Sequence, residues 1–209
     1  MPHAVLLGDS VFDNAVYVPD GPSVTEHLRD KLPDNWVVTL LAVDGDITSD
    51  VAEQLRGMPA DATHLLLSSG GNDALGQVHL LSQRANTVAE ALQFLTAVRE
   101  DFRKHYRRIL DMLLSTNRVL ACCTVYDSIP GLEPEALTAL AMFNEVILRE
   151  ALVSSTAVVD LRLICTVPGD YSELSSIEPS RQGGEKIASA LSRLLLGATT
   201  PTSPVSVYT

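Results

Sequence analysis

The stretch that decides the fold is HAVLLGDSVFDN, residues 3–14. Residues 4–7 form an apolar run of the length expected for a strand that is buried on both faces. The run stops at a turn of small residues, Gly8, Asp9 and Ser10. Open parallel sheets bind ligands at the carboxyl ends of their strands, because the loops that leave the strands converge there. We therefore expect Ser10 to lie at the end of a central strand, where a ligand can reach it.

Length and composition favour one domain with one hydrophobic core. The chain has 209 residues, of which 46% are hydrophobic, and this is short for two domains. We expect a domain over residues 1–196 and a flexible C-terminal tail over residues 197–209, because the tail has neither periodicity nor enough apolar side chains to pack. The formal net charge of -11 argues against a nucleic-acid partner, because phosphate contacts need clustered Lys and Arg, and the 15 present are scattered.

The sequence indicates neither a membrane segment nor a disulfide framework. The N-terminus enters the first apolar run at once, without the basic region, apolar core or cleavage site of a leader. No run approaches the ~18 apolar residues of a membrane span. Three cysteines are too few and too irregularly placed for a disulfide framework. The expectation is a cytoplasmic protein that does not contact a membrane.

Five apolar runs rich in β-branched residues alternate with segments of helical periodicity. Alternating strands and helices are most simply joined as a parallel sheet with right-handed crossovers. The predicted fold is therefore α/β, a three-layer α/β/α sandwich around a five-stranded parallel sheet in flavodoxin-like order. The expected strands cover residues 4–7, 36–43, 63–69, 119–125 and 157–164.

The expected helices lie between these strands and after the last one. Ser23, with Glu26 three residues later, resembles a helix N-cap, and Pro33 stops the helix that follows. A long helix is predicted over residues 87–115, with a buried stripe that includes Leu92. The remaining helices are expected over residues 48–57, after Pro134, and after Gly183 and Gly184.

Each of the first three expected strands ends in a turn of small residues, and all three turns should open at one edge of the sheet. The first turn carries Ser10, the second is Asp44-Gly45-Asp46, and the third is residues 70–73, GGND. These turns would bring together a hydroxyl, an accessible glycine N–H and an amide side chain. Acyl transfer needs such a set, an attacking oxygen with donors aimed at the developing oxyanion. The next segment, residues 75–86, has little pattern and is predicted to form a flap over the site.

The chain resembles the SGNH, or GDSL-type, hydrolase superfamily over residues 4 to about 195. The first family motif is matched by Gly8-Asp9-Ser10, the second by Gly45 and the third by Gly70-Gly71-Asn72-Asp73, each in order after an expected strand. The resemblance implies that Ser10 is the nucleophile. It also implies that the Ser10 N–H, the Gly45 N–H and the Asn72 side chain form an oxyanion hole.

The fourth motif departs from the family pattern. The family has an aspartate and, three residues later, a histidine that acts as the base, whereas Ser175 and Glu178 stand at those places here. All five histidines precede this segment, so a shifted alignment does not recover one. A free glutamate, with a pKa of about 4.3, is a weaker base than histidine, but burial can raise that pKa. The cation of Arg181 would instead lower it, unless Arg181 binds an anionic substrate or positions Glu178.

Four interpretations of the missing histidine stay open at this point. Glu178 could act directly as the base, and this interpretation is favoured. His79, in the predicted flap, could be borrowed for the role. Asp13 lies three residues after Ser10 and could share a helical face with it. In the fourth interpretation the chain is a catalytically inactive module that binds an acyl or sugar ligand in the same pocket.

The predicted function is hydrolysis of small, short-chain or acetyl esters through a Ser10 acyl-enzyme. No metal or organic cofactor is expected, because the sequence has neither a His/Cys ligand cluster nor a GxxxxGK[ST] phosphate loop. The expected partner is a small-molecule ester, and the sequence indicates no oligomeric state. The predicted catalytic residues are Ser10, Gly45, Asn72 and Glu178, with Asp9, Asp13, Asp73 and Arg181 as supporting candidates.

Overall fold

Five parallel strands form the sheet of the computed structural model, which describes residues 1–197. The strands follow the order β2-β1-β3-β4-β5, so the predicted α/β class and flavodoxin-like order are confirmed. Residues 198–209, which belong to the predicted C-terminal tail, lie outside the described part of the chain. The strands are β1 (His3–Gly8), β2 (Val37–Leu40), β3 (His64–Ser68), β4 (Val119–Cys123) and β5 (Ala157–Val159).

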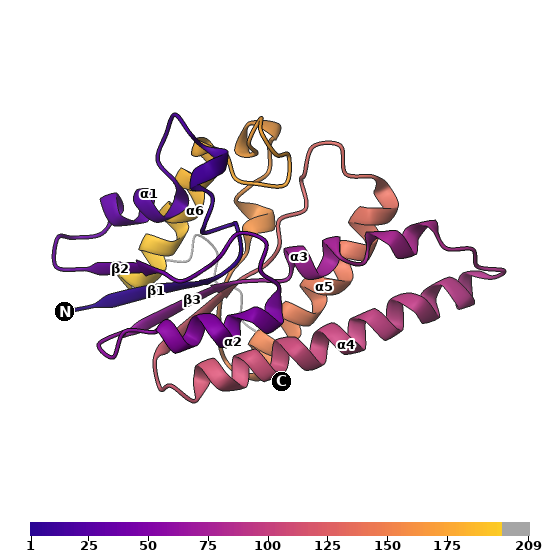
Figure 1. Ribbon diagram of the computed structural model, residues 1–209, viewed down its shortest axis with the longest axis horizontal. Helices are drawn as coiled ribbons and strands as arrows, with labels where there is room; N and C mark the ends of the chain where they lie inside the picture. The colour runs from indigo at the N-terminus through magenta and orange to yellow at the C-terminus, as the bar shows by residue number, and fades with distance from the viewer. Residues whose placement is uncertain (198–209) are drawn as a thin grey trace.

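Helices cover both faces of this sheet, as Figure 1 shows. One face carries α1 (Val24–Lys31) and α6 (Arg181–Leu195), and the other carries α2 (Val51–Gln54), α4 (Val88–Leu114) and α5 (Pro134–Val153). A short helix, α3 (Gly71–Leu75), follows β3 directly. Residues 1–197 also contain short 3-10 helices: η1 (Ala15–Tyr17), η2 (Thr48–Asp50), η3 (Leu55–Gly57), η4 (Val78–Ser82), η5 (Leu161–Leu163) and η6 (Pro168–Asp170).

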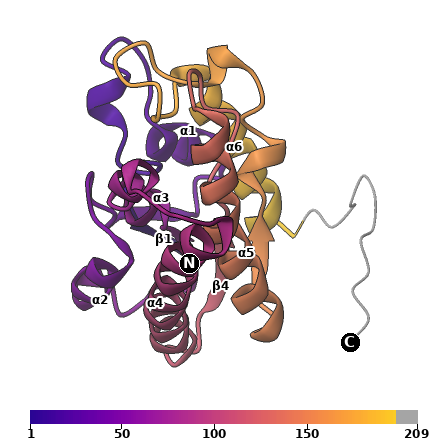
Figure 2. The ribbon, with the colours of Figure 1, turned by 90° about the vertical axis from the view of Figure 1, so that its right-hand side faces the viewer.

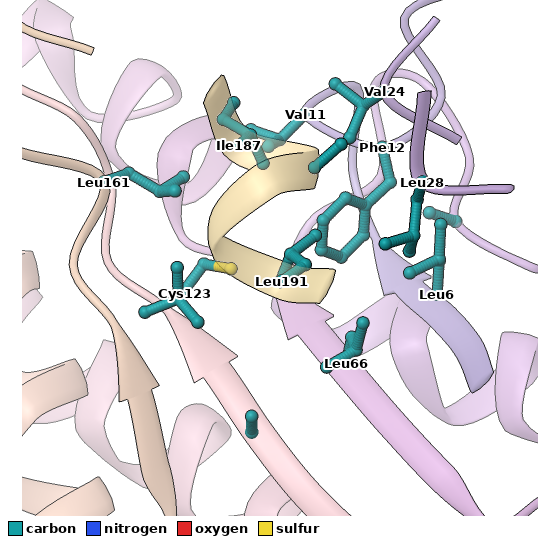
Figure 3. Packing of buried hydrophobic residues seen from close by; sticks show 14 of the residues in the cluster. Leu6, Val11, Phe12, Val24, Leu28, Leu66, Cys123, Leu161, Ile187 and Leu191 are labelled. Atoms are coloured by element: carbon teal, nitrogen blue, oxygen red, sulfur yellow. The ribbon is translucent and has the colours of Figure 1, made fainter. Parts of the chain in front are cut away.

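Alternation along the strands divides the hydrophobic core into two layers. Leu6 of β1 packs with α1 and α6, as the cluster in Figure 3 shows, whereas its neighbours Val5 and Leu7 pack with α4 and α5. Cys122 and Cys123 in β4 alternate in the same way. Side chains with a period of two fill both layers because every central strand is covered on both faces.

Local sequence signals set the helix ends. The side chain of Ser23 accepts a hydrogen bond from the N–H of Glu26, and the Glu26 carboxylate accepts one from the N–H of Ser23, which completes a capping box. Thr87 caps α4 in a similar way, through the N–H of Glu90. Pro134 occupies the first turn of α5, where its missing N–H has no cost. Within residues 1–197, no helix combines the length and apolar composition needed to span a membrane.

Expectations about two strand ends and one buried residue are wrong. The second strand ends at Leu40 rather than at residue 43. The last strand ends at Val159 rather than at residue 164, because the Asp160 carboxylate accepts a hydrogen bond from the N–H of Arg162 and turns the chain into η5. Leu92 is 55% exposed. The reason is that the first half of α4 extends past the sheet and finds no strand to cover, as Figure 1 shows.

Candidate active site

The turn after β1 can be formed only with glycine at its first position. Gly8 has a φ of +123°, and a Cβ added there would lie 1.6 Å from the carbonyl oxygen of Ser68 in β3. The next N–H, that of Asp9, donates a hydrogen bond of 3.1 Å to the same oxygen. This close packing of two neighbouring strands fixes the backbone that presents Ser10.

Ser10 and Glu178 lie in direct contact although 168 residues separate them in the chain. The Ser10 hydroxyl donates a hydrogen bond of 2.9 Å to Oε1 of Glu178. Both residues are buried, with exposed fractions of 6% and 4%. Burial raises the pKa of Glu178 to about 7, and the negative charge of Asp44 adds to the rise, while the hydrogen bond from Ser10 opposes it. A substantial fraction of Glu178 is therefore ionised near neutral pH and can accept a proton.

Within residues 1–197, no side chain forms a hydrogen bond to Glu178 other than that of Ser10. The other carboxylate oxygen of Glu178, Oε2, is buried and accepts no hydrogen bond from any group in the described residues. Ser175, which stands at the position of the family aspartate, contributes only its carbonyl oxygen, which accepts a hydrogen bond of 3.0 Å from the N–H of Glu178. The structure therefore shows a hydrogen-bonded pair of Ser10 and Glu178, here called the dyad, and no third side chain bonded to it in the part of the chain that the structure describes.

Backbone contacts hold the loop that carries Glu178. The N–H of Ser172 donates to the Glu178 carbonyl oxygen at 2.8 Å, and Tyr171 forms an antiparallel bridge with Pro179. The buried side chain of Asn14 donates to the Pro179 carbonyl oxygen at 3.1 Å. Asn14 also accepts a hydrogen bond from the N–H of Val24 at 2.9 Å, so it ties the loop to the start of α1.

Asn72 lines the same cavity as Ser10 and Glu178. Its side-chain amide donates a hydrogen bond of 2.9 Å to the carbonyl oxygen of Asp46, which leaves one amide hydrogen for a ligand. Gly45 lies one residue before Asp46 in an exposed turn, with a φ of +87°, and it does not line the cavity. The structure thus brings Ser10, Glu178 and Asn72 together and links the Gly45 turn to them through Asp46.

Gln54 in α2 is a site residue that the sequence reasoning missed. Its buried amide accepts from the N–H of Gly8 at 2.8 Å and donates to the Gly8 carbonyl oxygen and to the Asp46 carboxylate, each at 2.7 Å. It therefore joins the Ser10 turn to the Gly45 turn. A signal was present, because Gln54 lies between Val51 and Leu55 on the apolar face of the helix, where a polar residue needs partners.

Asp9 is a second buried carboxyl group beside the dyad. It is 4% exposed, lines the cavity and accepts a hydrogen bond of 3.2 Å from the N–H of Val11. Burial raises the pKa of Asp9 to about 8, and the negative charges of Glu178 and Asp73 add to the rise. Asp9 is therefore mostly uncharged at neutral pH.

Asp13 and Asp73 hold the turns around the site. The carboxylate of Asp13 accepts a hydrogen bond of 3.0 Å from the N–H of Asp44. That of Asp73 accepts from the N–H and the hydroxyl of Thr48 at 2.9 and 2.8 Å, and burial raises the Asp73 pKa. Both side chains are occupied in fixing the Gly45 turn and the start of η2, which gives them positioning roles.

Arg181 and His79 do not contact the dyad. The Arg181 side chain lies over Gly21, where an added Cβ would be 2.8 Å from its Cδ atom, and Arg181 is exposed. Its charge is not among the groups that shift the pKa of Glu178, so the expected lowering by this cation does not occur. His79 is exposed and hydrogen-bonds the Gly76 carbonyl oxygen at 3.0 Å. Within residues 1–197, no three His, Cys, Asp or Glu side chains are grouped closely enough to hold a metal ion.

A hydroxyl, a buried carboxylate and an amide donor at the carboxyl edge of a flavodoxin-like sheet are the groups that a serine hydrolase uses. The comparison with family models agrees with this class. The chain belongs to the GDSL-like lipase/acylhydrolase family, whose model matches residues 6–185. No curated protein matches the sequence.

Solved structures with the same fold are distant in sequence. A lipase/acylhydrolase from Enterococcus faecalis is 19% identical, with a TM-score of 0.68 and coverage of 98% of this chain and 100% of that protein. An acetyl xylan esterase from Geobacillus stearothermophilus is 13% identical, with a TM-score of 0.69 and coverage of 93% of this chain and 94% of that protein. A G-D-S-L family protein from Desulfitobacterium hafniense DCB-2 is 15% identical, with a TM-score of 0.68 and coverage of 93% and 99%. At these identities the likeness concerns the fold.

Proposed function

We propose that the protein is a serine acylhydrolase that uses Glu178 as its base. The Ser10 oxygen attacks the ester carbonyl carbon while Glu178 takes the hydroxyl proton. The tetrahedral intermediate then expels the alcohol, which receives that proton from Glu178. Water attacks the resulting acyl-enzyme, gives its proton to Glu178, and releases the acid as the proton returns to Ser10. One carboxyl group thus performs the cycle that an imidazole performs in a Ser-His pair.

The observation that carries this proposal is the buried hydrogen bond of 2.9 Å from the Ser10 hydroxyl to Glu178. A general base has to reach the proton that it abstracts, and it works best when its pKa lies near the working pH. Glu178 meets both conditions, because its pKa is raised to about 7. Asp13 and His79, the other candidate bases, are held by different partners.

The donors proposed for the oxyanion are the Asn72 amide and the N–H groups of Ser10 and Gly45. Within the described residues, neither of these two N–H groups donates a hydrogen bond to another protein group. Free donors held by a rigid turn stabilise a developing negative charge without reorganisation. The tie from Asn72 to Asp46 couples the amide to the Gly45 turn.

The substrate is proposed to be an uncharged ester, since the ionised form of Glu178 would repel an anionic one next to the reacting carbonyl. The sequence predicts a small or acetyl acyl group. One solved structure of similar fold is an acetyl xylan esterase and another is a lipase/acylhydrolase.

A serine-directed fluorophosphonate probe tests the proposal. We expect covalent labelling of the wild-type protein and none of a folded Ser10→Ala variant. Labelling that persists in Ser10→Ala would move the nucleophile to another residue. A folded wild-type protein that is neither labelled nor able to hydrolyse p-nitrophenyl esters would instead support the non-catalytic binding module.

A further inference from the structure

A cavity of about 110 Å³ begins at Ser10 and continues between the helices at the carboxyl edge of the sheet. Its walls come from α3, η4, the first half of α4 and the first half of α5. Figure 2 looks onto this end of the molecule and shows α3 and α5 beside the N-terminal end of α4. Asp9, Asn72 and Glu178 line the cavity together with Ser10, and apart from Ser68 and Gln77 the other lining side chains are aliphatic or aromatic.

We propose that this cavity holds the acyl chain of the substrate, and that this chain is an aliphatic group of medium length rather than an acetyl group. The inference rests on the proposed function, because it places the ester carbonyl at Ser10. It replaces the expectation of a small acyl group with a defined binding site for a longer one.

One wall of the cavity is a continuous apolar face of α5. Ala136, Ala139, Leu140 and Phe143 all line it, and their spacing of three, four and seven residues puts them on one side of the helix. This face extends about 10 Å along the helix axis, at 1.5 Å per residue. An acetyl group would leave most of that apolar length uncovered, whereas a longer chain would cover it.

The opposite wall consists of apolar side chains that are only partly buried. Leu75, Val78 and Leu81 line the cavity, yet they are 45%, 50% and 37% exposed. They belong to α3 and η4, in and beside the segment predicted as a flap. An alkyl chain that fills the space between these side chains and α5 would remove apolar surface from water, and such burial stabilises the complex.

The acyl chain fits this cavity better than the alkyl group of the alcohol does. The acyl group stays bound to Ser10 through the acyl-enzyme, so an enclosed apolar site can hold it throughout the reaction. The alcohol has to leave, and water has to take its place beside Glu178 before the second step. A dry apolar cavity would oppose that exchange.

Kinetics with p-nitrophenyl esters test the proposal directly. Each methylene that is buried adds about 0.8 kcal/mol, or about fourfold in kcat/KM. We expect p-nitrophenyl octanoate to exceed the butyrate at least tenfold in kcat/KM. A second set of esters varies the alcohol instead, and kcat/KM for octyl acetate should be little higher than that for ethyl acetate. A gain confined to the octyl alcohol would place the chain on the leaving-group side and overturn the assignment, as would a preference for acetate.

A matched pair of substitutions on α5 locates the chain. Ala139 lines the cavity, whereas Ala141 is exposed and does not line it. We expect Ala139→Phe to lower kcat/KM for the octanoate at least tenfold more than it lowers kcat/KM for the acetate. Ala141→Phe should change neither. Equal effects of both variants on the octanoate would contradict the placement.

A binding experiment separates this inference from the proposed mechanism. The Ser10→Ala variant should bind octanamide, an uncharged analogue, at least tenfold more tightly than acetamide in calorimetry, and Ala139→Phe added to it should abolish the difference. If wild-type protein hydrolyses no ester but this preference is observed, the catalytic proposal fails and the chain site stands. If esters are hydrolysed but octanamide shows no advantage, the chain site fails and the catalytic proposal stands.

Discussion

A carboxylate can serve as a base for a serine hydroxyl only when its pKa is brought close to neutrality. An exposed glutamate, with a pKa of about 4.3, would be ionised but would hold the transferred proton too weakly to pass it on efficiently. Burial of Glu178 raises its pKa toward neutrality, because the side chain is shielded from water and Oε2 meets no donor in the described residues. Desolvation therefore gives Glu178 the pKa that the proposed base needs.

The Glu178→Gln variant tests the base. Glutamine keeps the size of the side chain but accepts no proton, so kcat/KM should fall about 10²- to 10⁴-fold while the fold is retained. Glu173, which is exposed on the same loop, provides the matched control, and Glu173→Gln should keep wild-type activity. Turnover and circular dichroism of both variants check the prediction. Near-wild-type turnover of a folded Glu178→Gln protein would exclude Glu178 as the base.

The pH profile follows from the same carboxyl group. The base acts in its ionised form, so kcat/KM should rise as the pH increases through about 7 and then level off. The charge of Asp44 contributes to the raised pKa of Glu178, and its removal therefore lowers that pKa. We expect Asp44→Asn to move the rising limb to lower pH. The exposed Asp30→Asn should leave the limb in place, and a profile that Asp44→Asn does not move would contradict this account.

At the scale of elements, the site depends on three turns that are held in register by α2. Gln54 bonds both backbone groups of Gly8 and the carboxylate of Asp46. Asp46 in turn accepts the amide of Asn72 through its carbonyl oxygen. The ends of β1 and β3 and the turn after β2 are therefore connected through one glutamine. Loss of that connection would displace the proposed oxyanion donors relative to Ser10.

Gln54→Leu removes this connection with little change in volume. The buried N–H of Gly8 loses its hydrogen-bond acceptor, which costs about 1–3 kcal/mol, whereas the Gly8 carbonyl oxygen still accepts a hydrogen bond of 3.2 Å from the N–H of Val43. We expect a lower free energy of unfolding in urea and a fall in kcat larger than any change in KM, because the donors act mainly in the transition state. Gln83, which is exposed, offers the control Gln83→Leu. A normal kcat in a destabilised Gln54→Leu protein would limit Gln54 to a structural role.

The sequence predicted the elements well because their signals are local. The capping box at Ser23 and the apolar run before Gly8 each act within a few residues, and both features lie where they were expected. The end of β5 was misplaced, since the hydrogen bonds of Asp160 override the apolar character of the residues that follow. The order of motifs placed Glu178 in the functional region, and the structure adds its contact with Ser10.

The remaining features of the site could not be predicted because they depend on tertiary contacts. The raised pKa of Glu178 comes from burial, which no single residue encodes. Asn14 holds the Glu178 loop by donating a hydrogen bond to the carbonyl oxygen of Pro179, which lies 165 residues away in the sequence. The direction of the Arg181 side chain, over Gly21 and away from Glu178, likewise follows from how α6 packs beside the loop before α1. Such relations appear only once the layers are assembled.

At the scale of the whole molecule, the raised carboxyl pKa values make folding depend on pH. Asp9, Asp73 and Glu178 all have raised pKa values, chiefly because they are buried in a chain whose net charge is -11. When the chain unfolds, these groups regain ordinary pKa values of about 4. Above that pH the folded state binds more protons than the unfolded state, so stability falls as the pH rises.

Asp9 provides the sharpest test of this dependence. Its stabilising contribution is complete below about pH 4 and is lost as the pH rises through its folded pKa of about 8. Asparagine resembles the protonated carboxyl group, so the stability advantage of Asp9→Asn over the wild type should be smallest at pH 5 and should grow by on the order of a few kcal/mol by pH 9. The difference between the two melting curves cancels contributions of other groups, such as His64, whose pKa burial lowers. Carboxylates with lowered pKa values, such as Asp170, change stability only below about pH 5 and do not interfere. Calorimetric melting at pH 5, 7 and 9 checks this prediction, with Asp30→Asn as the exposed control. The stability difference from the wild type should widen with pH for Asp9→Asn alone. A difference that stays constant with pH would show that Asp9 ionises in the folded protein as it does in the unfolded chain.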